Sequence, residues 1–82
     1  MDDASLGRAV DHALQEVLAA AGRVLPAAAD AALQLDSLMV VALVDALETQ
    51  LPVRLRPQDV TATHFASRQS LQRLCRALLP RD

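Results

Sequence analysis

The chain has 82 residues, a net charge of −2, one cysteine and 52% hydrophobic residues, and Phe65 is its one aromatic residue. This composition excludes an internal disulfide and offers no cluster of metal ligands. No apolar stretch long enough for a signal peptide or a membrane span follows the acidic start Met1-Asp2-Asp3. We therefore expect a single cytoplasmic domain over residues 1–82, with no bound metal and a core of small aliphatic side chains.

Charge is unevenly distributed along the chain. Residues 1–50 hold eight acidic residues and two arginines, a net −6, whereas residues 51–82 hold six arginines and two acidic residues, a net +4. The acidic half would attract a basic partner over long range. Alternatively, both halves simply solvate the exposed faces of their helices.

The first predicted element is an amphipathic helix from about Ser5 to Ala21. Its apolar residues recur at helical spacing: Leu6, Val10, Leu14, Val17, Leu18 and Ala21. Gly22 follows as a residue that can close the helix in the left-handed conformation. Residues 23–35 contain Pro26 and several alanines, and they predict a long loop. Four apolar residues are expected to pin this loop to the core: Val24, Leu25, Leu33 and Leu35.

The second predicted helix begins after Asp36, a favoured N-cap residue that can accept backbone N–H groups of the first turn. It runs to about Gln50 or Leu51, because Pro52 disfavours helical backbone in the residue before it. One apolar stripe of this helix should face the core: Val40, Leu43, Val44, Leu47 and Leu51.

The rest of the chain predicts an extended segment, a short helix and a final helix. Residues 53–56 alternate apolar and basic side chains, and residues 57–65 are expected to contain one short helix. The final helix has its own apolar stripe: Leu71, Leu74, Cys75, Leu78 and Leu79. Ser67 or Ser70 would cap this helix, and Pro80 would end it. The domain core is expected to contain Leu14, Val17, Leu43, Val44, Leu47, Leu74 and Leu78.

Ser37 is the candidate functional residue, because it falls in the first turn of the second helix. Free backbone donors and the positive end of the helix dipole favour an attached anion there, such as a phosphodiester. On spacing alone, however, a serine at this place is more often a plain helix-start residue.

The second helix also has apolar residues outside its core stripe, and such a helix is either fully buried or presents a second face to partners. Full burial is not expected in so small a domain. We therefore predict a docking surface formed by Leu38, Met39, Ala42 and Asp45. The alternative is that Leu38 and Val41 cover the preceding loop.

One segment, together with the order of helices around it, resembles the phosphopantetheine attachment region of acyl carrier proteins: Leu35-Asp36-Ser37-Leu38-Met39-Val40-Val41. The likeness covers nearly the whole chain. It implies an all-α, right-handed four-helix bundle with three longer helices and one short one. Because the chain begins and ends with this domain, we expect a free-standing, monomeric carrier.

The resemblance implies that Ser37 carries 4′-phosphopantetheine, transferred from coenzyme A by a separate Mg²⁺-dependent transferase that also recognises Asp36. The terminal thiol of the arm would then hold an acyl group as a thioester, and the chain would have no catalytic activity of its own. Its other partners would be a loading ligase or acyltransferase, and synthase or tailoring enzymes. These would belong to polyketide, nonribosomal peptide or related antibiotic biosynthesis.

Departures from the family pattern refine this expectation. Met39 and Ala42 stand where fatty-acid carriers usually have acidic residues, which favours a specialised pathway with apolar docking. Peptidyl carriers usually have a glycine pair where this chain has Gln34-Leu35. The acyl type therefore fits better, although an aminoacyl or peptidyl carrier stays open. Gln34 also replaces a glycine that is frequent in acyl carriers.

Other function classes have less support in the sequence. An unmodified helical docking module is the main alternative. Nucleic-acid binding would use the arginines of the final helix, but the net charge is negative and no basic stretch with aromatic residues is present. A serine hydrolase is disfavoured, because neither His12 nor His64 lies near Ser37 in sequence and the Gly-x-Ser-x-Gly motif is absent. Cys75 is expected to be a core residue.

Overall fold

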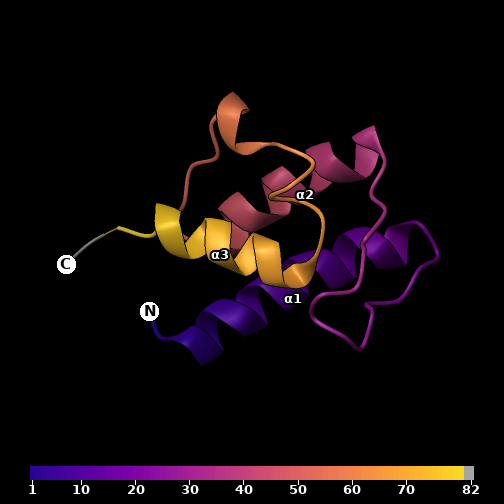
Figure 1. The fold of residues 1–82 in the computed structure, drawn as a ribbon, viewed down its shortest axis with the longest axis horizontal. Helices are drawn as coiled ribbons and strands as arrows, with labels where there is room; N and C mark the ends of the chain where they lie inside the picture. The colour runs from indigo at the N-terminus through magenta and orange to yellow at the C-terminus, as the bar shows by residue number, and fades with distance from the viewer. Residues whose placement is uncertain (81–82) are drawn as a thin grey trace.

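The computed structural model describes residues 1–80, and within that range the chain is all-helical, with no strand. Three α-helices and one 3₁₀ turn follow in order: α1 (Asp3–Ala20), α2 (Ser37–Gln50), η1 (Pro57–Asp59) and α3 (Arg68–Leu78), as Figure 1 shows. None of the helices in this range is long and apolar enough to cross a membrane. The helical class is thus confirmed, at the level of a small domain with three α-helices.

The expected fourth helix is not confirmed. The segment 57–65 forms a three-residue 3₁₀ helix, η1, followed by turns. Pro57 supplies a favourable first helical residue, but the backbone leaves helical geometry at Val60, where ψ is 82°. The β-branched residues Val60, Thr61 and Thr63 lose side-chain freedom in a helix. This composition therefore favours a 3₁₀ turn over a continuous α-helix.

The helix ends are set by local capping. The Asp2 side chain accepts the Ser5 N–H at 2.7 Å, so α1 begins about two residues before the expected start. Gly22 has a positive φ of 72°, as expected for a residue that closes a helix. Ser67 caps α3, and Ser70 accepts the Ser67 N–H in return, so the two serines form a reciprocal capping box.

The core forms where α1 packs against both α2 and α3. Most of the predicted core is buried, while Val44 and Leu78 are partly buried at its edge. Leu33 brings the long loop into the core, and Leu25 and Leu35 are partly buried against it. Val24 is 85% exposed, so the expectation that it pins the loop was wrong.

The uneven charge of the two halves is partly neutralised between α1 and α3. Arg68 forms an ion pair with Asp11 at 3.2 Å and donates to the carbonyl of Ala27 at 2.8 Å. Arg76 pairs with Asp3 farther along the same two helices. These pairs engage two of the final helix's arginines within the molecule, although the exposed pair of Arg76 and Asp3 contributes little to stability.

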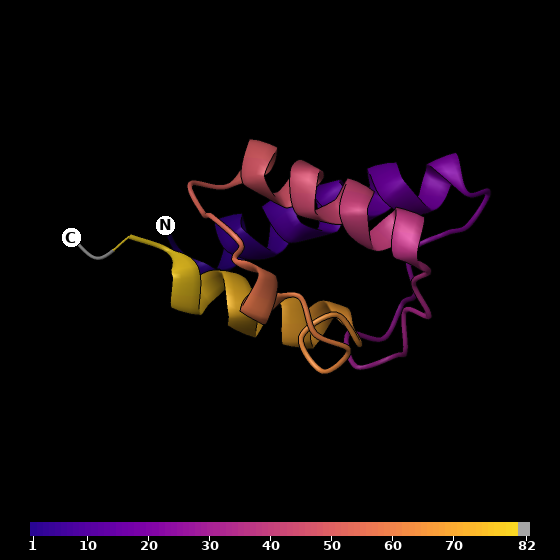
Figure 2. The same cartoon turned by 90° about the horizontal axis from the view of Figure 1, so that it is seen from above.

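The loop that precedes α2 lies at one end of the molecule. It crosses from the C-terminal end of α1 to the N-terminal end of α2, while the N-terminus and the C-terminal end of α3 lie at the opposite end (Figures 1 and 2). Ser37, as the first residue of α2, is therefore located at the loop end of the bundle.

Leu47 and Leu38 provide a direct test of the core, because the same substitution at these two positions of α2 should change the free energy of unfolding by very different amounts. Leu47 is fully buried, whereas Leu38 is 82% exposed. We expect Leu47→Ala to lower the free energy of unfolding by about 2–5 kcal/mol, and Leu38→Ala to change it by less than about 0.5 kcal/mol. Urea denaturation measures both. Equal effects of the two substitutions would contradict the described packing.

Candidate functional site

Ser37 is exposed at the start of α2, and the helix end around it is rich in backbone donors. The side chain of Asp36 accepts the Met39 N–H at 2.8 Å, and its carbonyl accepts the Val40 N–H at 2.9 Å. The N–H groups of Ser37 and Leu38 have no carbonyl partner within the helix, as is general for a first turn. A negative group attached to the Ser37 oxygen would thus lie at the positive end of the helix dipole.

An open groove of about 630 Å³ adjoins Ser37, between the start of α2 and the segment 60–66. Most of its lining is apolar, and its residues are Ala32, Gln34, Leu35, Asp36, Ser37, Val40, Val41, Val60, Thr61, Ala62, Phe65 and Ala66. This volume is within the range of sites that bind small molecules. The groove can therefore take an apolar group joined to Ser37 or placed near it.

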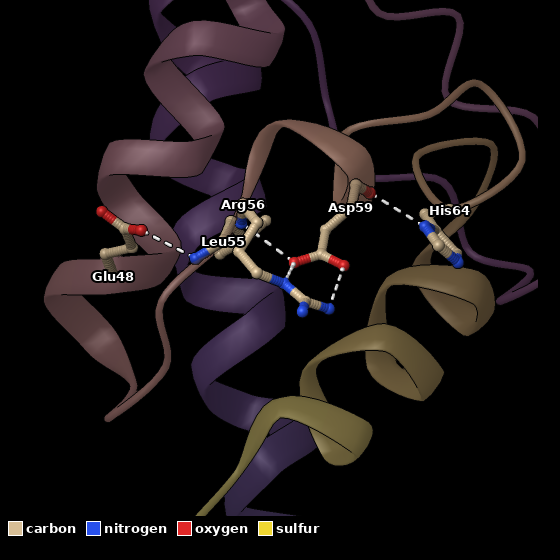
Figure 3. A network of polar contacts seen from close by, with 5 residues as sticks. All are labelled: Glu48, Leu55, Arg56, Asp59 and His64. Carbon is tan, nitrogen blue, oxygen red and sulfur yellow. Dashed lines mark hydrogen bonds and ion pairs between the residues drawn. The ribbon is translucent and has the colours of Figure 1, made fainter.

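The segment that forms the far wall of the groove is held by a polar network around Asp59 (Figure 3). The Asp59 carboxylate accepts the Arg56 backbone N–H at 2.9 Å and two guanidinium N–H groups at 3.1 and 3.2 Å. The ring Nδ1 of His64 lies 2.8 Å from the Asp59 carbonyl oxygen. Glu48 accepts the Leu55 N–H at 2.9 Å, which connects this segment to α2. Hydrogen bonds from Arg56 hold the pKa of Asp59 below its ordinary value.

The Asp59 network predicts a pH-dependent contribution to stability. Because the pKa of Asp59 is lower in the folded chain, its stabilising effect is present above the ordinary carboxyl pKa, near 4, and is lost as pH falls through the folded value. We expect Asp59→Asn to be less stable than the parent at neutral pH, and this difference to shrink as the pH falls below about 4. Urea denaturation across this range measures it.

Asp45→Asn is the matched control, because Asp45 is an exposed acid on α2. Its substitution should change the free energy of unfolding by less than about 0.5 kcal/mol at every pH. An Asp59→Asn variant as stable as the parent at neutral pH would show that the network does not stabilise the folded chain.

The outward face of α2 differs from the predicted docking surface at one residue. Leu38 and Val41 are 82% and 69% exposed, and Ala42 and Asp45 are also exposed. Met39, in contrast, is only 8% exposed, so its placement on that surface was wrong. We define the exposed α2 surface as Leu38, Val41, Ala42 and Asp45.

Met39 is buried because it takes the place on the core-facing stripe of α2 that was predicted for Val40, while the leucines of that stripe are buried as expected. Met39, Leu43 and Leu47 follow each other at intervals of four and are buried together, whereas Val40 and Val44 are half-buried. Apolar residues on several sides of α2 left the rotation of the helix undetermined by sequence. The loop before α2 also contacts Met39, through Arg23.

Met39 and Val41 test this rotation. Met39→Ala should lower the free energy of unfolding by about 2–5 kcal/mol, as for other truncations of buried aliphatic side chains. Val41→Ala, two residues farther along the same helix, should change it by less than about 0.5 kcal/mol. Thermal and urea denaturation check both values, and a larger effect at Val41 would mean that α2 is rotated the other way.

Arg23 connects the loop to the first turn of α2. Its guanidinium donates to the carbonyl of Gln34 at 3.1 Å and to that of Leu33, and Nη1 lies 3.8 Å from Sδ of Met39. Gln34 has a positive φ of 54°. This left-handed conformation costs a non-glycine residue about 1–2 kcal/mol. Gln34 thus occupies a position that glycine would adopt more easily.

The other chemically active side chains lie outside the groove lining. His12 pairs with Glu16 at 2.8 Å on the exposed side of α1, and His64 is held by Asp59. Cys75 is buried in the core, and burial raises the pKa of its thiol to about 11, so the thiol is protonated at neutral pH. Within residues 1–80, neither histidine hydrogen-bonds to Ser37.

The sequence correctly predicted the Asp36 cap and the place of Ser37 in the first turn of α2, but it did not predict the groove or the contacts of Arg23. The groove forms between segments separated by about twenty residues, and no local pattern indicates it. Comparisons with models of protein families, with curated proteins and with solved structures find no match to this chain. The site is therefore interpreted from its own residues and geometry.

Proposed function

We propose that this chain is an acyl carrier protein that holds an acyl group as a thioester on a phosphopantetheine arm at Ser37. It presents this group to enzymes of polyketide, nonribosomal peptide or related secondary-metabolite biosynthesis. The observation that carries the proposal is the exposed Ser37 at a capped helix N-terminus, in the rim of an apolar groove.

The residues around Ser37 suit an attached phosphodiester. The Ser37 hydroxyl would attack the coenzyme A phosphorus nearest to pantetheine, the phosphoanhydride bond would break, and 3′,5′-ADP would leave. The serine proton would pass to a base of the Mg²⁺-dependent transferase. Free N–H groups of the first turn and the helix dipole would stabilise the negative diester, while Asp36 holds that turn through the Met39 N–H. When bound, the arm supplies a thiol for thioester chemistry.

The groove favours an apolar acyl group over an aminoacyl group. Its lining is mostly alanine, valine, leucine and phenylalanine, and Asp36 is its one charged residue. Away from Asp36, an ammonium group taken into such a groove would lose water without a charged partner to compensate. An apolar chain would gain about 0.8 kcal/mol for each methylene fully removed from water.

The exposed α2 surface supports contact with partner enzymes. Leu38 and Val41 are the large apolar residues beside Ser37, and Asp45 adds a negative charge one turn beyond Val41. The same surface supports the second candidate, a helical docking module that is never modified. The two functions differ in one property, since a docking module does not need phosphopantetheine on Ser37.

Intact-mass measurement separates these candidates. The protein is incubated with coenzyme A, Mg²⁺ and a transferase of broad specificity, beside Ser37→Ala and Ser5→Ala. Ser5 is the matched control, because it too lies in the first turn of a helix capped by an aspartate. We expect one phosphopantetheine addition on the parent and on Ser5→Ala, and none on Ser37→Ala. No addition, under conditions that load a known carrier, would leave the docking module as the function.

A further inference from the structure

We propose that Arg23 is a positioning residue for group transfer at Ser37. Its hydrogen bonds hold residue 34 in the left-handed conformation that a glycine there would adopt unaided. This inference rests on the proposed function. Arg23 does not touch Ser37. It acts through the turn that immediately precedes α2 and through the first turn of the helix itself.

The first observation is the backbone of Gln34. Its φ of 54° is in the left-handed region, which glycine enters freely and other residues disfavour. The guanidinium of Arg23 donates hydrogen bonds to two consecutive carbonyl groups, that of Leu33 just before this residue and that of Gln34 itself. The planar, forked guanidinium suits two neighbouring acceptors, which a single ammonium cannot match. Arg23 therefore holds a conformation that Gln34 would otherwise tend to leave.

The second observation is the contact of Arg23 with α2. Nη1 lies 3.8 Å from Sδ of Met39, and the Met39 N–H is the one that Asp36 caps. Arg23 thus contacts the chain on both sides of Ser37, at Gln34 before it and at Met39 after it. The four residues from Leu35 to Leu38, Ser37 among them, lie between these two anchors, so the position of the serine hydroxyl depends on both.

The third observation connects the same turn to the groove. The Leu33 N–H donates to the Ala66 carbonyl at 2.9 Å, and the Leu33 side chain is fully buried. Ala66 lines the groove on the side opposite α2. A shift of the turn would therefore change the position of Ser37 and the width of the groove beside it.

The inference predicts a specific rescue. Arg23→Gln should release the turn, because glutamine is shorter and lacks the forked donors. Gln34→Gly should then restore its conformation, because glycine adopts the positive φ without help. A direct contact between Arg23 and the transferase would not be restored by a glycine at position 34. Arg73→Gln is the matched control, since Arg73 is an exposed arginine on α3.

The first readout uses the unmodified protein and needs no transferase. Amide hydrogen exchange, resolved by NMR, is measured at the Met39 N–H in the parent, Arg23→Gln, Gln34→Gly, the double variant and Arg73→Gln. We expect Arg23→Gln to accelerate exchange about tenfold, and the double variant to return towards the parent. Unchanged exchange in Arg23→Gln, at an unchanged melting temperature, would overturn the anchoring role.

The second readout is the kinetics of phosphopantetheine transfer to the same variants. A displaced hydroxyl lowers kcat, and we expect a loss of about tenfold in Arg23→Gln, with KM for the protein nearly unchanged and kcat recovered in the double variant. A raised KM without rescue by Gln34→Gly would overturn the inference in favour of a direct enzyme contact. If the parent is not loaded, the proposed function fails and the role of Arg23 in transfer with it, whereas exchange at Met39 still decides whether Arg23 anchors the turn.

Discussion

The first turn of α2 is the part of the structure on which the rest depends. Asp36 takes the Met39 N–H, the Met39 side chain enters the core, and Arg23 joins that side chain to the turn before the helix. The Asp36 cap contributes about 1 kcal/mol, and the buried Met39 side chain contributes more, since its truncation is expected to cost about 2–5 kcal/mol. Together they fix where α2 begins and how it is rotated, and hence where the Ser37 hydroxyl lies.

The rotation of α2 lets one helix contribute to three surfaces. Met39, Leu43 and Leu47 face the core, whereas Val40 and Val41 line the groove beside Ser37. The exposed α2 surface, which shares Val41 with the rim of the groove, is left for contact with other proteins. The sequence pattern predicts Val40 on the core-facing stripe and Met39 on the docking surface, whereas Met39 is buried and Val40 is half-buried beside the groove. In a domain of this size, such division of one helix among core, groove and surface is a consequence of having few elements.

Local signals in the sequence predicted the features that depend on neighbouring residues. The Asp36 cap, the left-handed Gly22 and a serine cap for α3, which is Ser67 of the two serines considered, follow from capping chemistry that acts within a few residues. The short helix expected in residues 57–65 is present only as the three-residue η1, because a proline start does not ensure that an α-helix continues through β-branched residues. The burial of Met39, the exposure of Val24, the groove and the contacts of Arg23 depend on how distant segments pack. In the sequence, Gln34 stands at a position where acyl carriers frequently have glycine. Only the structure shows that this residue has a positive φ.

The most direct measurement of the central claim is the location of the modification after incubation with coenzyme A, Mg²⁺ and a transferase. Cleavage after arginine releases residues 24–54 as one peptide, in which Ser37 and Thr49 are the two hydroxyl residues. Tandem mass spectrometry of this peptide distinguishes them, because fragmentation between the two positions separates their masses. The account predicts phosphopantetheine on Ser37, at the exposed N-terminus of α2. An unmodified peptide, or a modification on Thr49, would contradict it.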